Sequence, residues 1–101
     1  MRVFLDDLRP TPPGYDVRVY TAQEAIDVLS SMHVTEISLD NDLGVPEGPM
    51  TEGRHVADWI EQAAFEKRIP YCRVSIHSAN PVARRAMETA IKKAQEYWAN
   101  E

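Results

Sequence analysis

Ile37-Ser38-Leu39-Asp40-Asn41-Asp42 is a short, largely apolar run that ends abruptly in acid. Val3-Phe4-Leu5-Asp6-Asp7 repeats this pattern near the start of the chain. Such compact runs are typical of parallel strands that are buried on both faces. Asp16-Val17-Arg18-Val19-Tyr20 and Tyr71-Cys72-Arg73-Val74-Ser75-Ile76 alternate instead, which predicts half-exposed strands. We therefore expect the two compact strands at the centre of a sheet and the two alternating strands at its edges.

Amphipathic helices are expected between and after these strands. Thr21 and Glu24 have the spacing of a capping box ahead of the first helix. A second helix is predicted from about residue 52 to about residue 67. A third begins after Asn80-Pro81, a cap residue followed by the favoured first helical residue. Strand–helix–strand alternation implies right-handed crossovers, so we predict one α/β domain over residues 1–101 with three helices and an open, four-stranded parallel sheet in the order 2-1-3-4.

For two parts of this domain, the sequence allows more than one interpretation. The segment from Leu43 to Met50 has no periodicity and lies beside the acidic residues, so it is either a mobile lid or a plain connection. The helices after strands two and three should cover the same face of the sheet. The other face is then left to the last helix or to another protein, and we expect a monomer or a weak homodimer.

Composition excludes several classes of protein. A net charge of −5 argues against broad, sequence-independent nucleic-acid binding, but it leaves room for a small phosphorylated nucleotide or a nucleic-acid end. No apolar run is long enough to span a bilayer. The apolar run at the start of the chain is interrupted by acidic residues too soon to be a signal peptide. The one cysteine, Cys72, lies in an apolar run and is expected to be a small buried residue. These features predict a cytoplasmic protein without a membrane association.

Four carboxylates follow the two compact strands. Because the carboxyl ends of parallel strands meet at one edge of a sheet, Asp6 and Asp7 should lie close to Asp40 and Asp42. Carboxylates packed together repel unless a cation compensates them, and Mg²⁺ or Mn²⁺ takes such oxygen ligands beside a substrate phosphate. For any single aspartate a turn or helix cap is the simpler interpretation, and Asp42 before Leu43-Gly44 has that spacing. The two clusters together favour a divalent cation site.

A candidate phosphate site follows the last strand. His77 is a candidate acid or base, a metal ligand or an ordinary strand-end histidine. Asn80 opens the last helix, whose first turn is expected to present free backbone N–H groups to an anion. Ser78 and Arg84, one turn into the helix, are candidates to complete a phosphate cradle. Arg9, just after the first acidic pair, is a second candidate phosphate ligand or a plain surface arginine.

These residues resemble receiver domains of the phosphorelay type, which have a flavodoxin-like fold. The resemblance rests on the acidic pair Asp6-Asp7, on Asp40 as the phospho-accepting position, and on Ser78-Ala79 after the fourth strand. This chain has a proline-rich loop in place of the first receiver helix. It also lacks the fifth strand, which carries a lysine in receivers.

The chain is more closely similar to the receiver-derived family of cyclic-phosphate processing receiver domains. Three stretches carry the resemblance: Leu5-Asp6-Asp7-Leu8-Arg9-Pro10, Ser38-Leu39-Asp40-Asn41-Asp42-Leu43-Gly44 and His77-Ser78-Ala79-Asn80-Pro81. The resemblance implies a bacterial or phage protein that acts on cyclic phosphates in RNA-end repair or nucleotide metabolism. Members usually have a histidine between the two aspartates, where this chain has Asn41.

Three functions remain open from the sequence. The first is a metal-dependent phosphoesterase that opens a 2′,3′-cyclic or related phosphate, with His77, Asp40 and Asp7 as catalytic residues. Its metal ligands would be Asp6, Asp7, Asp40 and Asp42, and its phosphate ligands Arg9, Ser78, Asn80 and Arg84. The second is a non-catalytic module that binds a phosphorylated nucleotide or a partner protein. The third is a phospho-receiver with an acyl phosphate on Asp40.

Overall fold

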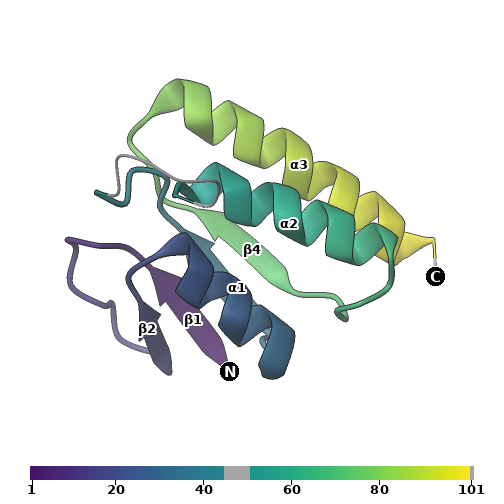
Figure 1. Cartoon of the computed structure of the whole chain (residues 1–101), viewed down its shortest axis with the longest axis horizontal. Helices are drawn as coiled ribbons and strands as arrows, with labels where there is room; N and C mark the ends of the chain where they lie inside the picture. Colours follow the sequence, from purple (N-terminus) through teal and green to yellow (C-terminus); the bar gives the residue numbers. More distant parts are fainter. Residues whose placement is uncertain (45–50, 101) are drawn as a thin grey trace.

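The computed structural model describes residues 1–44 and 51–100. Four parallel strands form one sheet in the order β2-β1-β3-β4, as predicted. The strands are β1 (Arg2–Leu5), β2 (Val17–Val19), β3 (Glu36–Leu39) and β4 (Arg73–Ile76). The helices are α1 (Ala22–Ser31), α2 (Gly53–Phe65) and α3 (Pro81–Ala99). The receiver-like α/β fold with compact central strands is therefore confirmed, and Figure 1 shows its arrangement.

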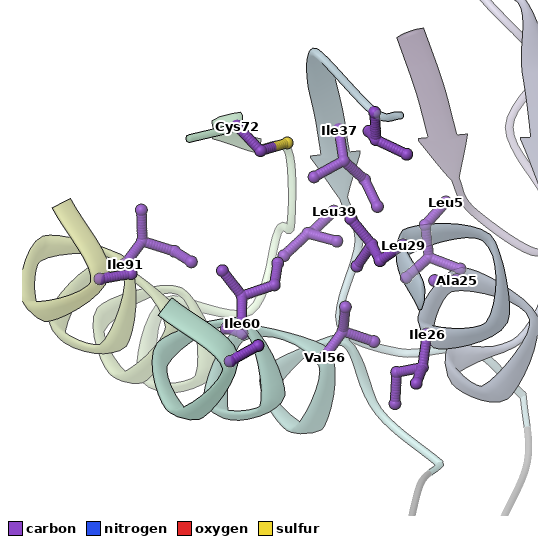
Figure 2. Packing of buried hydrophobic residues seen from close by; sticks show 14 of the residues in the cluster. Leu5, Ala25, Ile26, Leu29, Ile37, Leu39, Val56, Ile60, Cys72 and Ile91 are labelled. Carbon is purple, nitrogen blue, oxygen red and sulfur yellow. The ribbon is translucent and has the colours of Figure 1, made fainter. Parts of the chain in front are cut away.

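The hydrophobic core lies between the sheet and the helices. Figure 2 shows Leu5, Ile37 and Leu39 directed from the central strands toward α1 and α2, where Leu29 and Ile60 meet them. All three strand residues are completely buried. Burying a side chain of this size contributes about 1.5–3 kcal/mol, so β1 and β3 hold the sheet against the helical layer.

Local capping signals determine where the helices begin. Thr21 Oγ1 accepts a hydrogen bond from the Glu24 N–H at 3.1 Å, which confirms the predicted cap of α1. Before α2, His55 Nδ1 accepts hydrogen bonds from the backbone N–H groups of Thr51 and Glu52 at 3.2 and 3.1 Å. His55 therefore caps its own helix.

All three helices lie on the same side of the sheet. Figure 1 shows α3 packed along α2, and Figure 2 shows both helices below the strands together with α1. In the described residues the opposite face is covered by side chains instead of a helix. Tyr15 packs edge-on against Phe4 with ring centroids 5.3 Å apart, and the Arg18 guanidinium lies 5.5 Å from the Phe4 ring. Helix α3 therefore does not cover this face, and polar and aromatic side chains lie on it.

The remaining expectations concern the membrane, the cysteine and the lid. Within the described part of the chain, every helix is too short or too polar to cross a membrane. Cys72 is buried as expected, and burial raises the pKa of its thiol to about 12, so it is a poor nucleophile. Of the expected lid or connection, residues 45–50 fall outside the described residues.

Candidate functional site

Asp6, Asp40 and His77 each follow a strand of the sheet by one residue. Their backbone N–H groups extend the strand ladder, donating to Val19, Leu5 and Leu39 carbonyls at 3.2, 3.1 and 3.0 Å. Side chains alternate along strands, so these three residues face the side opposite the core-facing residues that precede them. One ligand atom from each residue lies within 4.8 Å of the others. Topology therefore gathers them at the carboxyl edge, on the face without a helix.

Asp6 is only 1% exposed, and its carboxylate accepts four hydrogen bonds. Its Oδ1 accepts from the backbone N–H groups of Leu8 and Arg9 at 2.8 and 2.9 Å. Its Oδ2 contacts the Arg9 guanidinium at 3.1 Å and His77 Nε2 at 3.0 Å. Burial alone would raise the pKa of Asp6, but these donors outweigh it and lower the pKa below the ordinary 3.8. Asp6 is therefore an ionised, fixed acceptor.

Replacing Asp6 by asparagine should lower the free energy of unfolding by about 2 kcal/mol at neutral pH, because buried donors lose a charged acceptor. Since the folded pKa of Asp6 is below 3.8, its stabilisation is present above that pH and is lost as pH falls through the folded value. Urea unfolding of both proteins at about pH 7 and about pH 3 measures this. The stability difference should shrink at the lower pH, and an equal difference at both would contradict the assignment.

Asp40 lies beside Asp6 but in a different electrostatic environment. It is 7% exposed, and its Oδ1 lies 3.6 Å from the Arg9 guanidinium. Burial raises the pKa of Asp40, the Asp6 charge adds to this, and a hydrogen bond from the Asn41 backbone only partly offsets it. The two adjacent carboxylates therefore differ: Asp6 is stabilised as an anion, whereas Asp40 carries a charge that the fold compensates incompletely.

His77 is oriented by three neighbours. Its ring stacks on Phe4 with centroids 4.7 Å apart and an interplanar angle of 8°. Nε2 contacts Asp6, and Nδ1 lies 2.7 Å from Ser38 Oγ. Ser38 was not predicted from the sequence as a functional residue, although a polar residue between two apolar ones in a central strand was an available signal.

Asp7 and Asp42 complete the acidic wall of a cavity of about 220 Å³. Asp7 Oδ1 is buried and has no hydrogen-bond partner among the described residues. Asp42 is exposed, and its Oδ1 accepts a hydrogen bond from Asn41 Nδ2 at 3.1 Å. The cavity is lined by the four aspartates Asp6, Asp7, Asp40 and Asp42, and by Leu8, Arg9 and Ala79. All four predicted carboxylates therefore border the same space.

The residues at the start of α3 are engaged within the helix cap. Asn80 Oδ1 accepts hydrogen bonds from the N–H groups of Val82 and Ala83, both at 3.1 Å. The expectation of free N–H groups in this turn was therefore wrong, because asparagine satisfies its own helix first. Ser78 Oγ accepts from the Asn80 N–H at 3.1 Å, and Arg84 Nε pairs with Glu88 at 2.9 Å. None of the three candidates Ser78, Asn80 and Arg84 lines the acidic cavity.

Asn41 connects the site to the start of α2. It is 2% exposed, its Oδ1 accepts from the Arg54 N–H, and its carbonyl accepts from the Gly53 N–H, both at 3.0 Å. A Cβ built on Gly53 would lie 1.7 Å from the Asp40 carbonyl oxygen. Helix α2 therefore packs directly against the backbone that carries Asp40. Asn41 accepts hydrogen bonds from the first N–H groups of this helix.

Comparison with known proteins shows the family of this chain. The model of the cyclic-phosphate processing receiver domain matches residues 1–93. The chain belongs to this family. No curated protein and no solved structure matches it. The matched range covers the seven strands and helices of the described residues as far as residue 93, and Asp6, Asp40 and His77 lie within it.

Proposed function

We propose that this receiver domain is a metal-dependent phosphoesterase that opens a cyclic phosphate, either a 2′,3′-cyclic RNA end or a related nucleotide. The observation that carries the proposal is the clustering of Asp6, Asp40 and His77, whose two aspartates line an open, acidic cavity. Membership of a cyclic-phosphate processing family supports the same chemistry. The proposal adds a substrate class and a reaction to that membership.

The donor set at the cavity fits a hard divalent cation. Asp6 and Asp40 lie side by side, and Asp40 is incompletely compensated as an anion. Asp7 contributes a buried oxygen that lacks a hydrogen-bond partner within the described chain. These three residues, with Asp42 at the exposed rim, would hold Mg²⁺ or Mn²⁺ through carboxylate oxygens. The bound cation would supply charge neutralisation and Lewis acidity beside the substrate phosphate.

Arg9 is the residue best suited to bind the phosphate. Its guanidinium contacts Asp6 and Asp40, and it donates a hydrogen bond to the His77 carbonyl at 3.3 Å. The side chain is 47% exposed, so it remains accessible from the cavity that it lines. A guanidinium fixed in this way presents donors to phosphate oxygens, which stabilises the charge that accumulates during phosphoryl transfer.

His77 is the proton-transfer group of the proposed reaction. Water attacks phosphorus, the bond from phosphorus to one ring oxygen breaks, and that oxygen receives a proton to become a hydroxyl. The product is a phosphomonoester, so water supplies all added atoms. His77 Nε2 points to the acidic cluster and carries the proton that the leaving oxygen needs, and the proton that water loses replaces it.

A panel of cyclic-phosphate compounds tests the proposal. Purified protein with Mg²⁺ or Mn²⁺ should convert at least one compound to a monoester, detected by phosphorus NMR. A chelator should stop the reaction, because the carboxylates cannot neutralise the phosphate charge themselves. Absence of product over hours with every compound and metal would overturn the proposal.

One observation favours a second function, a module that binds a phosphorylated nucleotide or a partner protein without turnover. The histidine that usually separates the two aspartates in this family is Asn41 here, and Asn41 is engaged in bonds to Gly53, Arg54 and Asp42. If proton transfer needs that histidine, the site binds without reacting. Tight ligand binding by calorimetry without product would select this function.

A further inference from the structure

Ser38 is the buried polar residue at the centre of the open sheet face. It lies in β3, is 4% exposed, and pairs in register with Phe4 of β1 and Ser75 of β4. Its neighbours in the chain, Ile37 and Leu39, both enter the hydrophobic core. Ser38 therefore points away from the helices, toward the face on which His77 lies.

The hydroxyl of Ser38 contacts the ring nitrogen of His77 that faces away from the carboxylates. Ser38 Oγ lies 2.7 Å from Nδ1, and Asp6 Oδ2 lies 3.0 Å from Nε2. The Phe4 ring stacks against the imidazole and limits its tilt. Both ring nitrogens thus have protein partners, and a flip of the ring would break both contacts.

The two partners make different demands on the imidazole. An ionised carboxylate only accepts hydrogen bonds, so the Asp6 contact requires a proton on Nε2. In the neutral ring, Nδ1 then accepts a hydrogen bond from the Ser38 hydroxyl. A hydroxyl both donates and accepts, so Ser38 satisfies Nδ1 with or without a proton on it. An apolar residue at this position would leave Nδ1 unpaired.

We propose that Ser38 is a positioning residue that holds the His77 imidazole in one orientation, with Nε2 directed at the carboxylate cluster. Ser38 does not line the cavity and acts through His77. The consequence for catalysis rests on the proposed function, whereas the orientation of the ring does not. Partners that orient an active-site histidine typically contribute about 10–100-fold to activity or metal affinity.

The matched variants are Ser38→Ala and Ser75→Ala. Ser75 is the direct register neighbour of Ser38 on the same face, and within the described residues the hydroxyl that is hydrogen-bonded to His77 Nδ1 is that of Ser38. Nitrogen NMR of histidine-labelled protein should show one tautomer of His77, protonated at Nε2, in the wild type and in Ser75→Ala. Ser38→Ala should shift the Nδ1 resonance, because this nitrogen loses its hydrogen-bond partner, and turnover should fall about 10–100-fold relative to Ser75→Ala.

The NMR readout separates this inference from the proposed function. If the wild type turns over no cyclic phosphate but Ser38→Ala alone changes the ring nitrogens, Ser38 positions His77 and the proposed reaction is wrong. Unchanged ring nitrogens in folded Ser38→Ala would overturn the inference.

Discussion

Asp40→Asn should abolish turnover of cyclic phosphates while making the folded chain more stable. Burial raises the pKa of Asp40 and the Asp6 charge adds to it, so ionised Asp40 costs folding free energy above its folded pKa. Asparagine has nearly the same shape but no charge, so this cost disappears. We expect a gain of about 1 kcal/mol at neutral pH, the trade-off seen where an active site is electrostatically strained.

The loss of turnover has a separate cause. Asp40 supplies a carboxylate oxygen within 4.8 Å of the ligand atoms of Asp6 and His77, and an amide cannot neutralise a cation there. Turnover should fall about 10³-fold, the size expected when one preorganised electrostatic group is removed. The control is Asp58→Asn, the same change at an exposed position of α2, which should leave both quantities unaltered. Full activity in Asp40→Asn, or a loss of stability at neutral pH, would contradict this account.

Gly53→Ala should be among the most destabilising single-methyl changes in the chain. In an ordinary helical position this substitution stabilises by about 0.5–1 kcal/mol, since alanine is the better helix former. Here the added Cβ would lie 1.7 Å from the Asp40 carbonyl oxygen and 2.9 Å from the Asn41 Cα. These are backbone atoms, so α2 or the end of β3 must move. We expect a loss of about 3 kcal/mol, at the upper end of overpacking costs.

The same displacement should reach the site, because the crowded backbone carries Asp40. Chemical unfolding and turnover of Gly53→Ala measure the two effects together. Gln62→Ala, an exposed change in the same helix, should stay within about 0.5 kcal/mol of the wild type. A Gly53→Ala protein as stable as the wild type would mean that α2 does not pack against the Asp40 backbone as described.

The sequence was sufficient to predict the elements and the order of the sheet. Compact apolar runs identified β1 and β3 as central, and the crossover rule then placed Asp6 beside Asp40. The cap at Thr21 and the Asn80-Pro81 start of α3 follow from interactions within a few residues. Signals of this kind depend on local geometry and on simple periodicity, so they can be read without coordinates.

The position of α3 could not be predicted in the same way. A helix between two parallel strands is constrained by the right-handed crossover, but α3 follows the last strand and connects to no further one. Its place was determined by packing against α2, through buried residues such as Met87 and Ile91. The choice between the two faces of the sheet depends on that side-chain packing.

The hydrogen-bond partners of the site residues also could not be predicted from the sequence pattern. Ser78, Asn80 and Arg84 have side chains suited to phosphate, but each finds a partner in its own helix or turn. Ser38 shows the reverse, since a strand serine proves to contact His77. Residue type indicates what a side chain is able to bind, and only the packing of neighbours decides which of these bonds forms.

Titration calorimetry of Mn²⁺ tests most directly whether the carboxylate cluster is a cation-dependent phosphate site. The account predicts one ion bound per chain in the wild type and in Asp58→Asn. Binding should be lost in Asp40→Asn and in Asp6→Asn, the two carboxylates that lie with His77. Equal Mn²⁺ binding in Asp40→Asn and Asp58→Asn, or no binding in the wild type, would contradict it.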